Sequence, residues 1–518
     1  MKKEMKIYHY ILALFSVVLI GSCSKDLGNY AYESINELNI KGVSNEYFVR
    51  TGIDTLRIQP TIAASMDESD TSRYSYLWIL KTGSLTFDTI GHYRNLAYPV
   101  RLNAVPYDLF YRVLDSKTGV TWIANSKIIV STPYSRGFLI MGEDEEGFAE
   151  AEMLSMLTDT VHIKQILSKS GLPRLREPVS MVHTGGGELY VRLWAMTKTG
   201  SYYFNRATME ATASNNLSRL AYVSEALDAE TLHPVVVAPQ IRTAAGAIGS
   251  SLYRAMITQG GDVFASVPLF MGGDFYNNPV NRIATAQEVR IPAAPYIMYP
   301  INSMNSIMWY DTQNNRFMNF ASIGVGTAST VLSDASGSIF PWNQPAGRTL
   351  VYAENTRNTD GGSTNGNSFA IMKDADNTCH IYKFYANGTN PAKRGFYTIK
   401  STATDFHKAD FYAFSSNRSV VFYAVGNRLY AYDYNPGFEK NYTISNVGAD
   451  QITMLKFDTQ IDHLTNSLYV ATYNSATKGT LRRFRVGTDP NTVELTIQDN
   501  STWTGLVKVK DINWRAVN

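Results

Sequence analysis

Apolar and polar residues alternate along this chain in short runs, and turn-forming residues separate one run from the next. Between residues 35 and 132 every run has this period of two, with clear examples at residues 74–80 and 107–115. A period of two is typical of strands that bury one face, and closely spaced strands with turns between them favour an antiparallel sandwich. We therefore expect a sandwich of about 100 residues at residues 35–132, with Trp78 packed in its core.

A second pattern begins at residue 136, where a local theme recurs to the end of the chain. The theme is a turn residue, then Leu or Ile, then Tyr, then further alternation. Seven copies, two of them degenerate, lie at residues 136–142, 187–194, 249–256, 306–310, 377–385, 426–432 and 466–473. Their mean spacing is roughly 55 residues, near the 40–50 of propeller blades once loops are inserted. The chain is therefore expected to be all-β, with a β-propeller-like domain of about seven blades at residues 136–518. Each copy would be an inner strand of a four-stranded blade.

Two stretches depart from the alternation because their apolar residues recur at helical spacing. Residues 148–170 favour either a short helix or a long hairpin inserted near the first blade. Residues 217–229 favour a helix, since Leu217, Leu220 and Leu227 would share one face. We expect both stretches to pack as core or capping elements.

The N-terminus carries the features of an export signal. Basic residues precede an apolar run at residues 10–20, and small residues then lead to Cys23. This order is typical of a secretory signal peptide, and the run is too short for a permanent membrane span. A cysteine directly after the small residues is typical of a bacterial lipobox. We expect a signal peptide at residues 1–22, lipidation of Cys23, and a tether at residues 23–34.

The charge balance excludes one class of partner. Removing residues 1–22 takes Lys2, Lys3, Lys6 and Glu4 from the 47 basic and 45 acidic residues, which leaves 44 of each. A neutral chain has no general field that attracts nucleic acid. We therefore expect no nucleic-acid partner, and attachment to the membrane through the covalent lipid.

The cysteines give little indication of catalytic or disulfide chemistry. The chain has two cysteines, and lipidation of Cys23 leaves Cys379 without a disulfide partner. No spacing marks a His and Asn constellation around Cys379, so a buried strand thiol is favoured over a nucleophile. Packing alone is expected to stabilise the exported fold.

Three short motifs carry a family resemblance. The segment at residues 25–32 contains Gly28-Asn29-Tyr30, and Tyr74 to Trp78 and Tyr111 to Asp115 follow in two of the predicted strands. Together with the lipobox, these motifs resemble the PKD-like lipoproteins of Bacteroidetes. The resemblance implies that residues 35–132 form a PKD-like, immunoglobulin-like β-sandwich.

The same resemblance implies a cellular location and partners. Members of the family look like accessory lipoproteins of the outer membrane that act with SusC/SusD-like importers of oligosaccharides or peptides. The extracellular face of the outer membrane is the expected location. Lipoproteins displayed there tend to carry several acids after the cysteine, whereas this chain has only Asp26. That departure leaves the periplasmic face as an alternative. No catalytic residue is implied.

Motifs for catalysis and cofactors are missing from the sequence. There is no His-Glu-x-x-His motif and no Gly-x-Ser-x-Gly motif, and residues 324–329 lack the third glycine of a dinucleotide loop. We expect no catalytic residue, no metal site and no cofactor. Two loops rich in oxygen ligands, at residues 142–147 and 358–367, invite a calcium interpretation, but neither has the EF-hand order of ligands. A solvated hairpin turn and a mobile surface loop are the alternatives.

Aromatic residues in loop-like segments are the best candidates for ligand contact. Sugar rings and extended peptides both bind by laying apolar faces on aromatic rings. The candidates are Tyr276, Trp309, Tyr310 and Trp342. Packing between blades is the alternative for each of them.

The sequence leaves three functional hypotheses. The first is a non-catalytic accessory lipoprotein of a SusC/SusD-like uptake complex, which binds an oligosaccharide or peptide, the importer, or both. The second is a propeller-type glycoside hydrolase or polysaccharide lyase with carboxylates in the central funnel. The third is a structural or adhesive surface protein.

Overall fold

The computed structural model describes residues 36–66, 71–157, 159–184, 192–239, 241, 252–388, 390–462, 464 and 466–516. The signal peptide, Cys23 and the tether lie outside this range. Contacts along the chain divide it into two compact units. The first comprises Met1–Tyr47, Thr55–Tyr98 and Tyr107–Ile128, and the second comprises Phe48–Asp54, Pro99–Pro106 and Ile129–Asn518. The predicted boundary at residues 132–136 lies close to the last change of unit.

Most strands of the first unit belong to one five-stranded antiparallel sheet, whose order is β2-β9-β8-β5-β6. Two pairs, β1-β4 and β3-β7, complete the N-terminal part, and a short 3-10 helix, η1, precedes β5. The bounds are β1 (Leu38–Lys41), β2 (Glu46–Arg50), β3 (Thr55–Ile58), β4 (Thr61–Ala64), η1 (Thr71–Arg73), β5 (Tyr74–Lys81), β6 (Phe87–Gly91), β7 (Leu96–Pro99), β8 (Pro106–Asp115) and β9 (Thr121–Ser131).

The family motifs meet in this sheet as cross-strand partners. Trp78 on β5 pairs with Tyr111 on β8, and their rings stack with centroids 4.2 Å apart. Both side chains are fully buried, which confirms the predicted core position of Trp78. Asp115, at the end of β8, pairs with Arg73 inside the protein and also accepts a hydrogen bond from the backbone N–H of Lys117. The guanidinium lowers the pKa of Asp115 to about 2.

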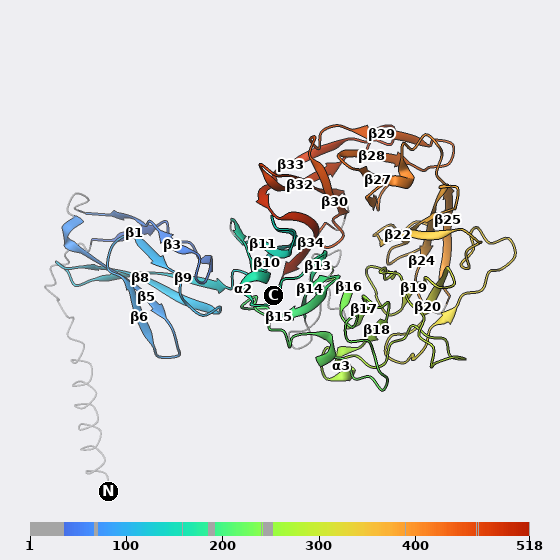
Figure 1. The fold of residues 1–518 in the computed structure, drawn as a ribbon. Coiled ribbons are helices and arrows are strands. Elements are labelled where there is room, and N and C mark those ends of the chain that lie inside the picture. Colours follow the sequence, from blue (N-terminus) through green and yellow to red (C-terminus); the bar gives the residue numbers. More distant parts are fainter. Residues whose placement is uncertain are drawn as a thin grey trace, which may run out of the picture. The chain divides into compact units, whose positions relative to one another are not determined.

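The second unit contains seven small antiparallel sheets among the described residues, and Figure 1 shows them following one another around a ring. In each sheet the strands follow chain order, except that the C-terminal strand joins the first sheet beside β10. The first three sheets are β34 (Lys508–Ala516), β10 (Arg136–Glu143), β11 (Ala149–Met156) and β12 (Thr160–Ile163); β13 (Pro178–His183), β14 (Leu193–Thr197) and β15 (Gly200–Phe204); and β16 (Pro234–Val237), β17 (Arg254–Thr258) and β18 (Val263–Ser266).

The remaining four sheets complete the ring. They are β19 (Ile307–Asp311), β20 (Arg316–Phe320) and β21 (Thr330–Val331); β22 (Thr349–Asn355), β23 (Ser368–Lys373), β24 (Cys379–Tyr385) and β25 (Ala392–Thr398); β26 (Phe411–Phe414), β27 (Val420–Val425), β28 (Arg428–Asp433) and β29 (Lys440–Ile444); and β30 (Gln451–Phe457), β31 (Ser467–Asn474), β32 (Lys478–Val486) and β33 (Leu495–Leu506). The short helices are α2 (Ile166–Lys169), η3 (Leu217–Arg219), α3 (Pro268–Met271) and η4 (Phe406–Lys408).

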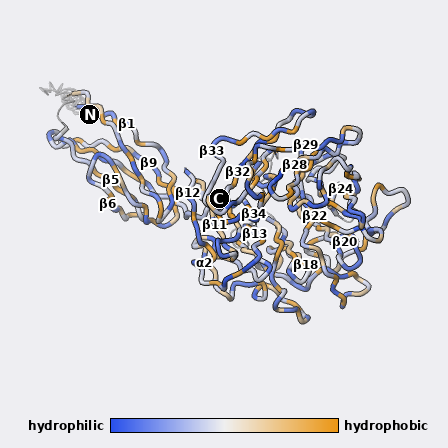
Figure 2. Tube along the Cα trace, turned by 45° about the horizontal axis from the view of Figure 1, so that its top comes forward, coloured by the Kyte–Doolittle hydropathy of each residue, from blue (hydrophilic) through white to orange (hydrophobic). Residues whose placement is uncertain are grey.

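Hydrophobic packing between sheets makes the arrangement propeller-like. Each core cluster joins two successive sheets, as Leu139 of the first sheet and Met181 of the second illustrate. The last cluster packs Ala471 and Leu481 of the seventh sheet against Phe138 and Trp514 of the first. A single small sheet buries one face at most, so stacking neighbours on both faces buries the rest and leaves only short edges. Figure 2 shows the resulting mixture of apolar and polar positions along the strands.

The sequence repeats fall on seven different sheets, on β10, β14, β17, β19, β24, β28 and β31. Much of the copy at residues 187–194 and the start of the copy at 249–256 lie outside the described residues. The strands that contact one another around the centre of the ring are the first of each sheet, such as β13, β30 and β34. Six copies form the second or third strand of their sheets, whereas the copy on β19 forms the first.

Of the two stretches with helical spacing, the first forms one of its two expected structures and the second does not form the expected helix. Residues 148–170 form the hairpin of β11 and β12 followed by the single turn of α2, so the hairpin alternative holds. Residues 217–229 begin with one turn of 3-10 helix, η3, and then continue without a helix. Leu217 and Leu220 are buried there, as the apolar spacing requires. No helix among the described residues has the length and hydropathy needed to span a membrane.

Candidate functional site

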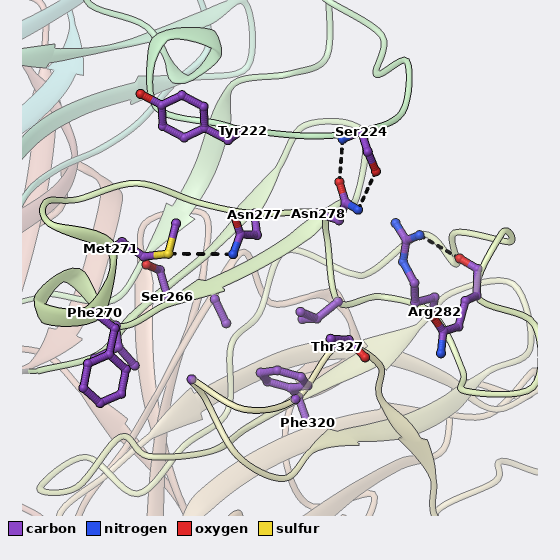
Figure 3. A pocket seen from close by; sticks show the side chains of 16 residues that line it. Tyr222, Ser224, Ser266, Phe270, Met271, Asn277, Asn278, Arg282, Phe320 and Thr327 are labelled. Atoms are coloured by element: carbon purple, nitrogen blue, oxygen red, sulfur yellow. Dashed lines mark hydrogen bonds between the residues drawn. The ribbon is translucent and has the colours of Figure 1, made fainter.

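A pocket of about 470 Å³ opens between the third and fourth sheets of the second unit. Four stretches of the chain line it: the segment after η3, the end of β18 with α3, the loop at residues 272–287, and the end of β20 with the loop at 322–328. Figure 3 shows Tyr222 and Phe270 at separate borders of the pocket, with Asn277 toward the middle of the view and Asn278 beside Ser224. Its volume lies within the roughly 300–1,000 Å³ of small-molecule sites.

Two aromatic rings at the border of the pocket are exposed to solvent. Phe270 is 74% exposed and Tyr222 is 62% exposed. Phe270 lies on α3, where Leu269, Phe270 and Met271 follow Pro268 in a helix too short to bury all three. The ring of Phe275 packs edge-on against Tyr222 at 5.4 Å and supports it from the side. Solvent-exposed rings beside a cavity are typical of ligand-binding surfaces.

Uncharged polar groups lie between these rings. Asn278 and Ser224 hold each other by two hydrogen bonds, from the Ser224 backbone N–H to Asn278 Oδ1 and from Asn278 Nδ2 to Ser224 Oγ, both 2.8 Å long. Asn277 donates only to the sulfur of Met271, at 3.7 Å. The first pair is therefore a fixed part of the wall, whereas Asn277 keeps hydrogen-bonding capacity for a ligand.

The one charged side chain in the lining, Arg282, is used by the protein itself. Its Nε donates to the carbonyl of Pro279 at 2.8 Å, one terminal nitrogen donates to the carbonyl of Gln287 at 2.6 Å, and the other pairs with Glu225 at 2.5 Å. Arg282 is only 8% exposed. It therefore stabilises the loop that forms one side of the pocket.

Two backbone features shape the walls. The loop at residues 322–328 passes so close to α3 that a Cβ on Gly324, whose φ is +106°, would lie 2.8 Å from Val267. Within the loop at 272–278, buried Asp274 accepts a hydrogen bond from the hydroxyl of Tyr276 and lies 3.8 Å from Arg254. Burial raises the pKa of Asp274, and Arg254 opposes that rise.

The four aromatic residues predicted to contact ligand are core residues, so the ligand-binding prediction is wrong for them. Tyr276, Trp309, Tyr310 and Trp342 are each at most 3% exposed and belong to the clusters between sheets. A ring without an exposed face cannot stack on a ligand. The packing alternative is the one that the structure supports.

A second polar group lies on the inner strands, and we call it the inner-strand cluster. Its residues are Ser180 on β13, Tyr352 and Glu354 on β22, Lys456 on β30, and Asp511 and Asn513 on β34. Lys456 Nζ donates to Asp511 at 2.8 Å, and Asp511 also accepts from Ser180 and Asn513. Glu354 accepts from the hydroxyl of Tyr352 at 3.0 Å and from the backbone N–H of Phe414.

The two carboxyl groups of this cluster differ in their surroundings. Glu354 is half-buried, and desolvation by the surrounding protein raises its pKa to about 7. Hydrogen bonds from Phe414 and Tyr352 oppose that rise. Asp511 instead has Lys456 as a direct ion-pair partner. A carboxyl group with a raised pKa is a feature of proton-transfer sites, and also of structural networks.

The first unit has a more open depression of about 730 Å³ beside β8 and β9. Glu46, Asp108 and Lys127 contribute to its lining, so charged groups face solvent there. Phe110 is its only aromatic residue. It therefore lacks the pair of exposed rings that distinguishes the pocket of the second unit.

Neither loop that invited a calcium interpretation forms a cation site by its side chains: among the described residues, no group of three or more His, Cys, Asp or Glu residues is arranged so that it could hold a metal ion. In the loop at 142–147, Asp144 accepts from two backbone N–H groups of its own turn, and Arg174 pairs with it at 2.7 Å. In the loop at 358–367, buried Asn367 donates to Asn358 at 2.8 Å. The two ends of this loop are therefore buried and hydrogen-bonded to each other, whereas residues 359–362 lie at the surface.

Cys379 matches the interpretation as a structural thiol. It is buried on β24, and burial raises its pKa to about 11. A thiol with such a pKa is almost entirely protonated at neutral pH, whereas the thiolate is the nucleophile.

One family model matches the N-terminal part of the chain. Trp78 and Tyr111, which carry the motifs, stack on each other across β5 and β8. Residues 23–170 match the model of the PKD-like family. The PKD-like region thus includes the strands of the first unit and continues through α2 of the second.

Solved structures offer only distant likenesses. A quinonprotein alcohol dehydrogenase-like protein from Bacteroides thetaiotaomicron shares 13% identity over 91% of this chain and 97% of its own, with a TM-score of 0.36. The extracellular domain of a putative hybrid two component system from the same organism shares 9% identity over 89% of this chain and 64% of its own, with a TM-score of 0.37. A prolyl endopeptidase shares 7% identity over 73% and 51%, with a TM-score of 0.35. No curated protein matches. None of these proteins' activities is carried over to this chain.

Sequence reasoning missed the residues that line the pocket, although signals for two of them exist. Phe270 stands in a run of three large apolar residues after a proline. Asn277 lies directly beside the predicted Tyr276, in the correct loop.

Proposed function

We propose that this protein is a non-catalytic, lipid-anchored binding protein of the outer membrane, on its extracellular face, and an accessory component of a SusC/SusD-like uptake complex. Its second unit would be a seven-bladed β-propeller that binds a nutrient oligomer, an oligosaccharide or a peptide. The lipobox at Cys23 and the PKD-like match support the location and the partner. The observation that carries the binding function is the pocket with its two exposed rings beside uncharged amides.

A binding screen with product analysis tests this function. The full-length protein, purified in detergent, is screened against oligosaccharide and peptide libraries, and every compound that binds is incubated with it and analysed for cleavage. We expect binding without turnover. Turnover of a bound oligomer would contradict the proposal.

The anchor and the partner need a separate experiment. A Cys23→Ala variant is expected to leave the outer-membrane fraction, because the thiol that carries the lipid is lost. Co-purification of the wild-type protein from intact outer membranes is expected to recover a SusC/SusD-like pair. Recovery of the lipoprotein alone, while another lipoprotein keeps its importer in the same extract, would contradict the proposed partner.

The raised pKa of Glu354 favours a second candidate, a glycan hydrolase or lyase that uses the inner-strand cluster. The hydrogen bonds of that cluster instead favour a structural role for its two carboxyl groups. Both oxygens of Glu354 already accept hydrogen bonds, and Asp511 accepts three. Loss of any detected turnover in a Glu354→Gln variant would support the enzyme.

A further inference from the structure

We propose that the pocket between the third and fourth sheets binds the end of a neutral oligosaccharide. This inference rests on the proposed function, which is binding of an oligomer, and it adds the chemical class of the ligand. The charge of the pocket, its free hydrogen-bonding groups, its exposed rings and the adjoining strand edge each bear on that class.

The charge of the pocket disfavours an ionic ligand. Arg282 is the one charged residue of the lining, and Glu225 neutralises it while two backbone carbonyls take its other contacts. A uronate, a phosphate or an ammonium group would lose its hydration here without gaining an oppositely charged partner. Burial of an unpaired charge costs far more than burial of a hydroxyl.

The free hydrogen-bonding groups match hydroxyl groups. Asn277, Gln287 and Thr327 line the pocket with exposed, uncharged side chains. Among the described residues, the side chains of Gln287 and Thr327 form no hydrogen bond, and Asn277 has only its weak contact with the sulfur of Met271. Amides and hydroxyls both donate and accept, and a sugar hydroxyl requires both from its surroundings.

The two exposed rings match the apolar faces of sugars. The C–H face of a pyranose ring stacks on an aromatic face while its equatorial hydroxyls point outward to polar groups. Tyr222 and Phe270 offer such faces at separate borders of the pocket, with Asn277 between them in Figure 3. This arrangement suits successive rings of an oligosaccharide.

An extended peptide finds too little strand edge here. Peptides that bind by strand addition need free backbone N–H and C=O groups at a sheet edge. β18 is the edge of the third sheet, but the carbonyl of Val263 accepts from Val280, its N–H donates to Asn281, and Ser266 Oγ donates to the carbonyl of Phe275. The segment at residues 275–281 therefore covers the Val263 end of this edge, and Ala265 alone among the residues of β18 keeps outward-facing backbone groups, which is too short an edge for strand addition.

Calorimetric titration of the full-length protein in detergent tests the proposal. The probes are neutral hexasaccharides of glucose, xylose, mannose and galactose, a hexamer of galacturonate, and mixed hexapeptides. We expect at least one neutral hexasaccharide to bind, and the Tyr222→Ala and Phe270→Ala variants to weaken its binding at least tenfold. Phe438→Ala is the matched control, because Phe438 is also 74% exposed but does not line the pocket. We expect no change in its affinity.

The outcomes separate this inference from the function on which it rests. Binding of galacturonate or of peptides, without any neutral hexasaccharide, would overturn the ligand class and leave oligomer binding intact. Failure of every probe would contradict both. Binding of a neutral hexasaccharide that the two ring variants do not weaken would overturn the assignment of the pocket.

Discussion

The aromatic residues between the sheets and those at the border of the pocket belong to the same chemical class but occupy opposite environments. Trp309 and Trp342 have no usable exposed face, whereas Phe270 and Tyr222 expose more than half of their surface. The first pair lies in clusters that join successive sheets. The second pair borders a cavity. Aromatic residues therefore stabilise the fold where they are buried between sheets, and they can bind a ligand where they are exposed beside the pocket. The exposed fraction of the side chain distinguishes the two roles.

One loop contains both environments in adjacent residues. Tyr276 points into the core between the second and third sheets, and its hydroxyl donates to buried Asp274. Asn277 and Asn278 are exposed and line the pocket. The buried residues thus fix the backbone that presents the two amides.

The largest effect is expected from a core aromatic. Trp309→Ala should lower the free energy of unfolding by about 3–5 kcal/mol, because a fully buried ring is replaced by a cavity. The variant also leaves Ser329 without the donor at Trp309 Nε1, 2.9 Å away. Denaturant unfolding measures the loss, with Phe438→Ala as the control that should change stability by less than about 0.5 kcal/mol. A loss below about 1 kcal/mol for Trp309→Ala would contradict its core role.

A similar loss, by a different cause, is expected in the first unit. Asp115→Ala removes the carboxylate that pairs with buried Arg73, which should cost about 3–5 kcal/mol. The pKa of Asp115 is lowered to about 2 in the folded state. Its stabilising contribution is therefore complete above the unfolded pKa of about 3.9 and is lost as the pH falls toward 2.

Hydrogen exchange of the amides in β5 and β8 measures this local loss in the full chain. Asp108, which is about half exposed and pairs with Lys81 at 3.7 Å, supplies the control variant Asp108→Ala. Equal protection in the Asp115→Ala variant and the wild type would contradict the structural role of the buried pair.

The alternation of residues was enough to predict that the chain is all-β and where many strands lie, because period two follows from the pleat. It was not enough to predict which aromatic residues are free. All five residues of β19 are buried, since a sheet in the ring has neighbours on both faces. The segment around Trp309 lacks alternation because both of its faces are buried. It therefore resembles a loop if strands are expected to expose one face to solvent.

The pocket could not be predicted from the sequence for a different reason. Its walls come from residues as far apart as Tyr222 and Thr327, and no local periodicity encodes that meeting. The desolvation of Glu354 likewise depends on neighbouring strands, such as β26, that lie distant in the sequence. The local sequence was enough to select the loop at residues 272–278. It was not enough to select the residue of that loop that faces the pocket.

A smaller, pH-dependent effect is expected from the inner-strand cluster. The pKa of Glu354 rises from 4.5 to about 7 on folding, so the folded state binds the proton more tightly than the unfolded state does. Its contribution to stability is therefore greatest below about pH 4.5 and is lost as the pH rises through 7, by about 1–3 kcal/mol. Glu354→Gln should remove this part of the pH dependence.

Urea unfolding of the wild type and of the Glu354→Gln variant at pH 5 and pH 8 checks this expectation. The difference in unfolding free energy between the two pH values should be smaller in the variant. Identical pH profiles would mean that Glu354 does not take up a proton on folding.

The smallest effect on stability is expected at the border of the pocket. Tyr222→Ala and Phe270→Ala should change the free energy of unfolding by less than about 0.5 kcal/mol, because exposed rings contribute little to packing. Thermal unfolding of each variant, compared with that of the wild type, measures the change in stability. A loss as large as that of Trp309→Ala would show that these rings belong to the core.

The most direct test measures stability and binding together in one variant. For Phe270→Ala, urea unfolding and calorimetric titration with the neutral hexasaccharides are performed on the same preparation, with Phe438→Ala beside it. We expect unchanged stability in both variants and at least tenfold weaker binding in Phe270→Ala alone. Equal affinities in the two variants, or a loss of stability that accounts for the loss of binding, would contradict the assignment of this pocket as the binding site.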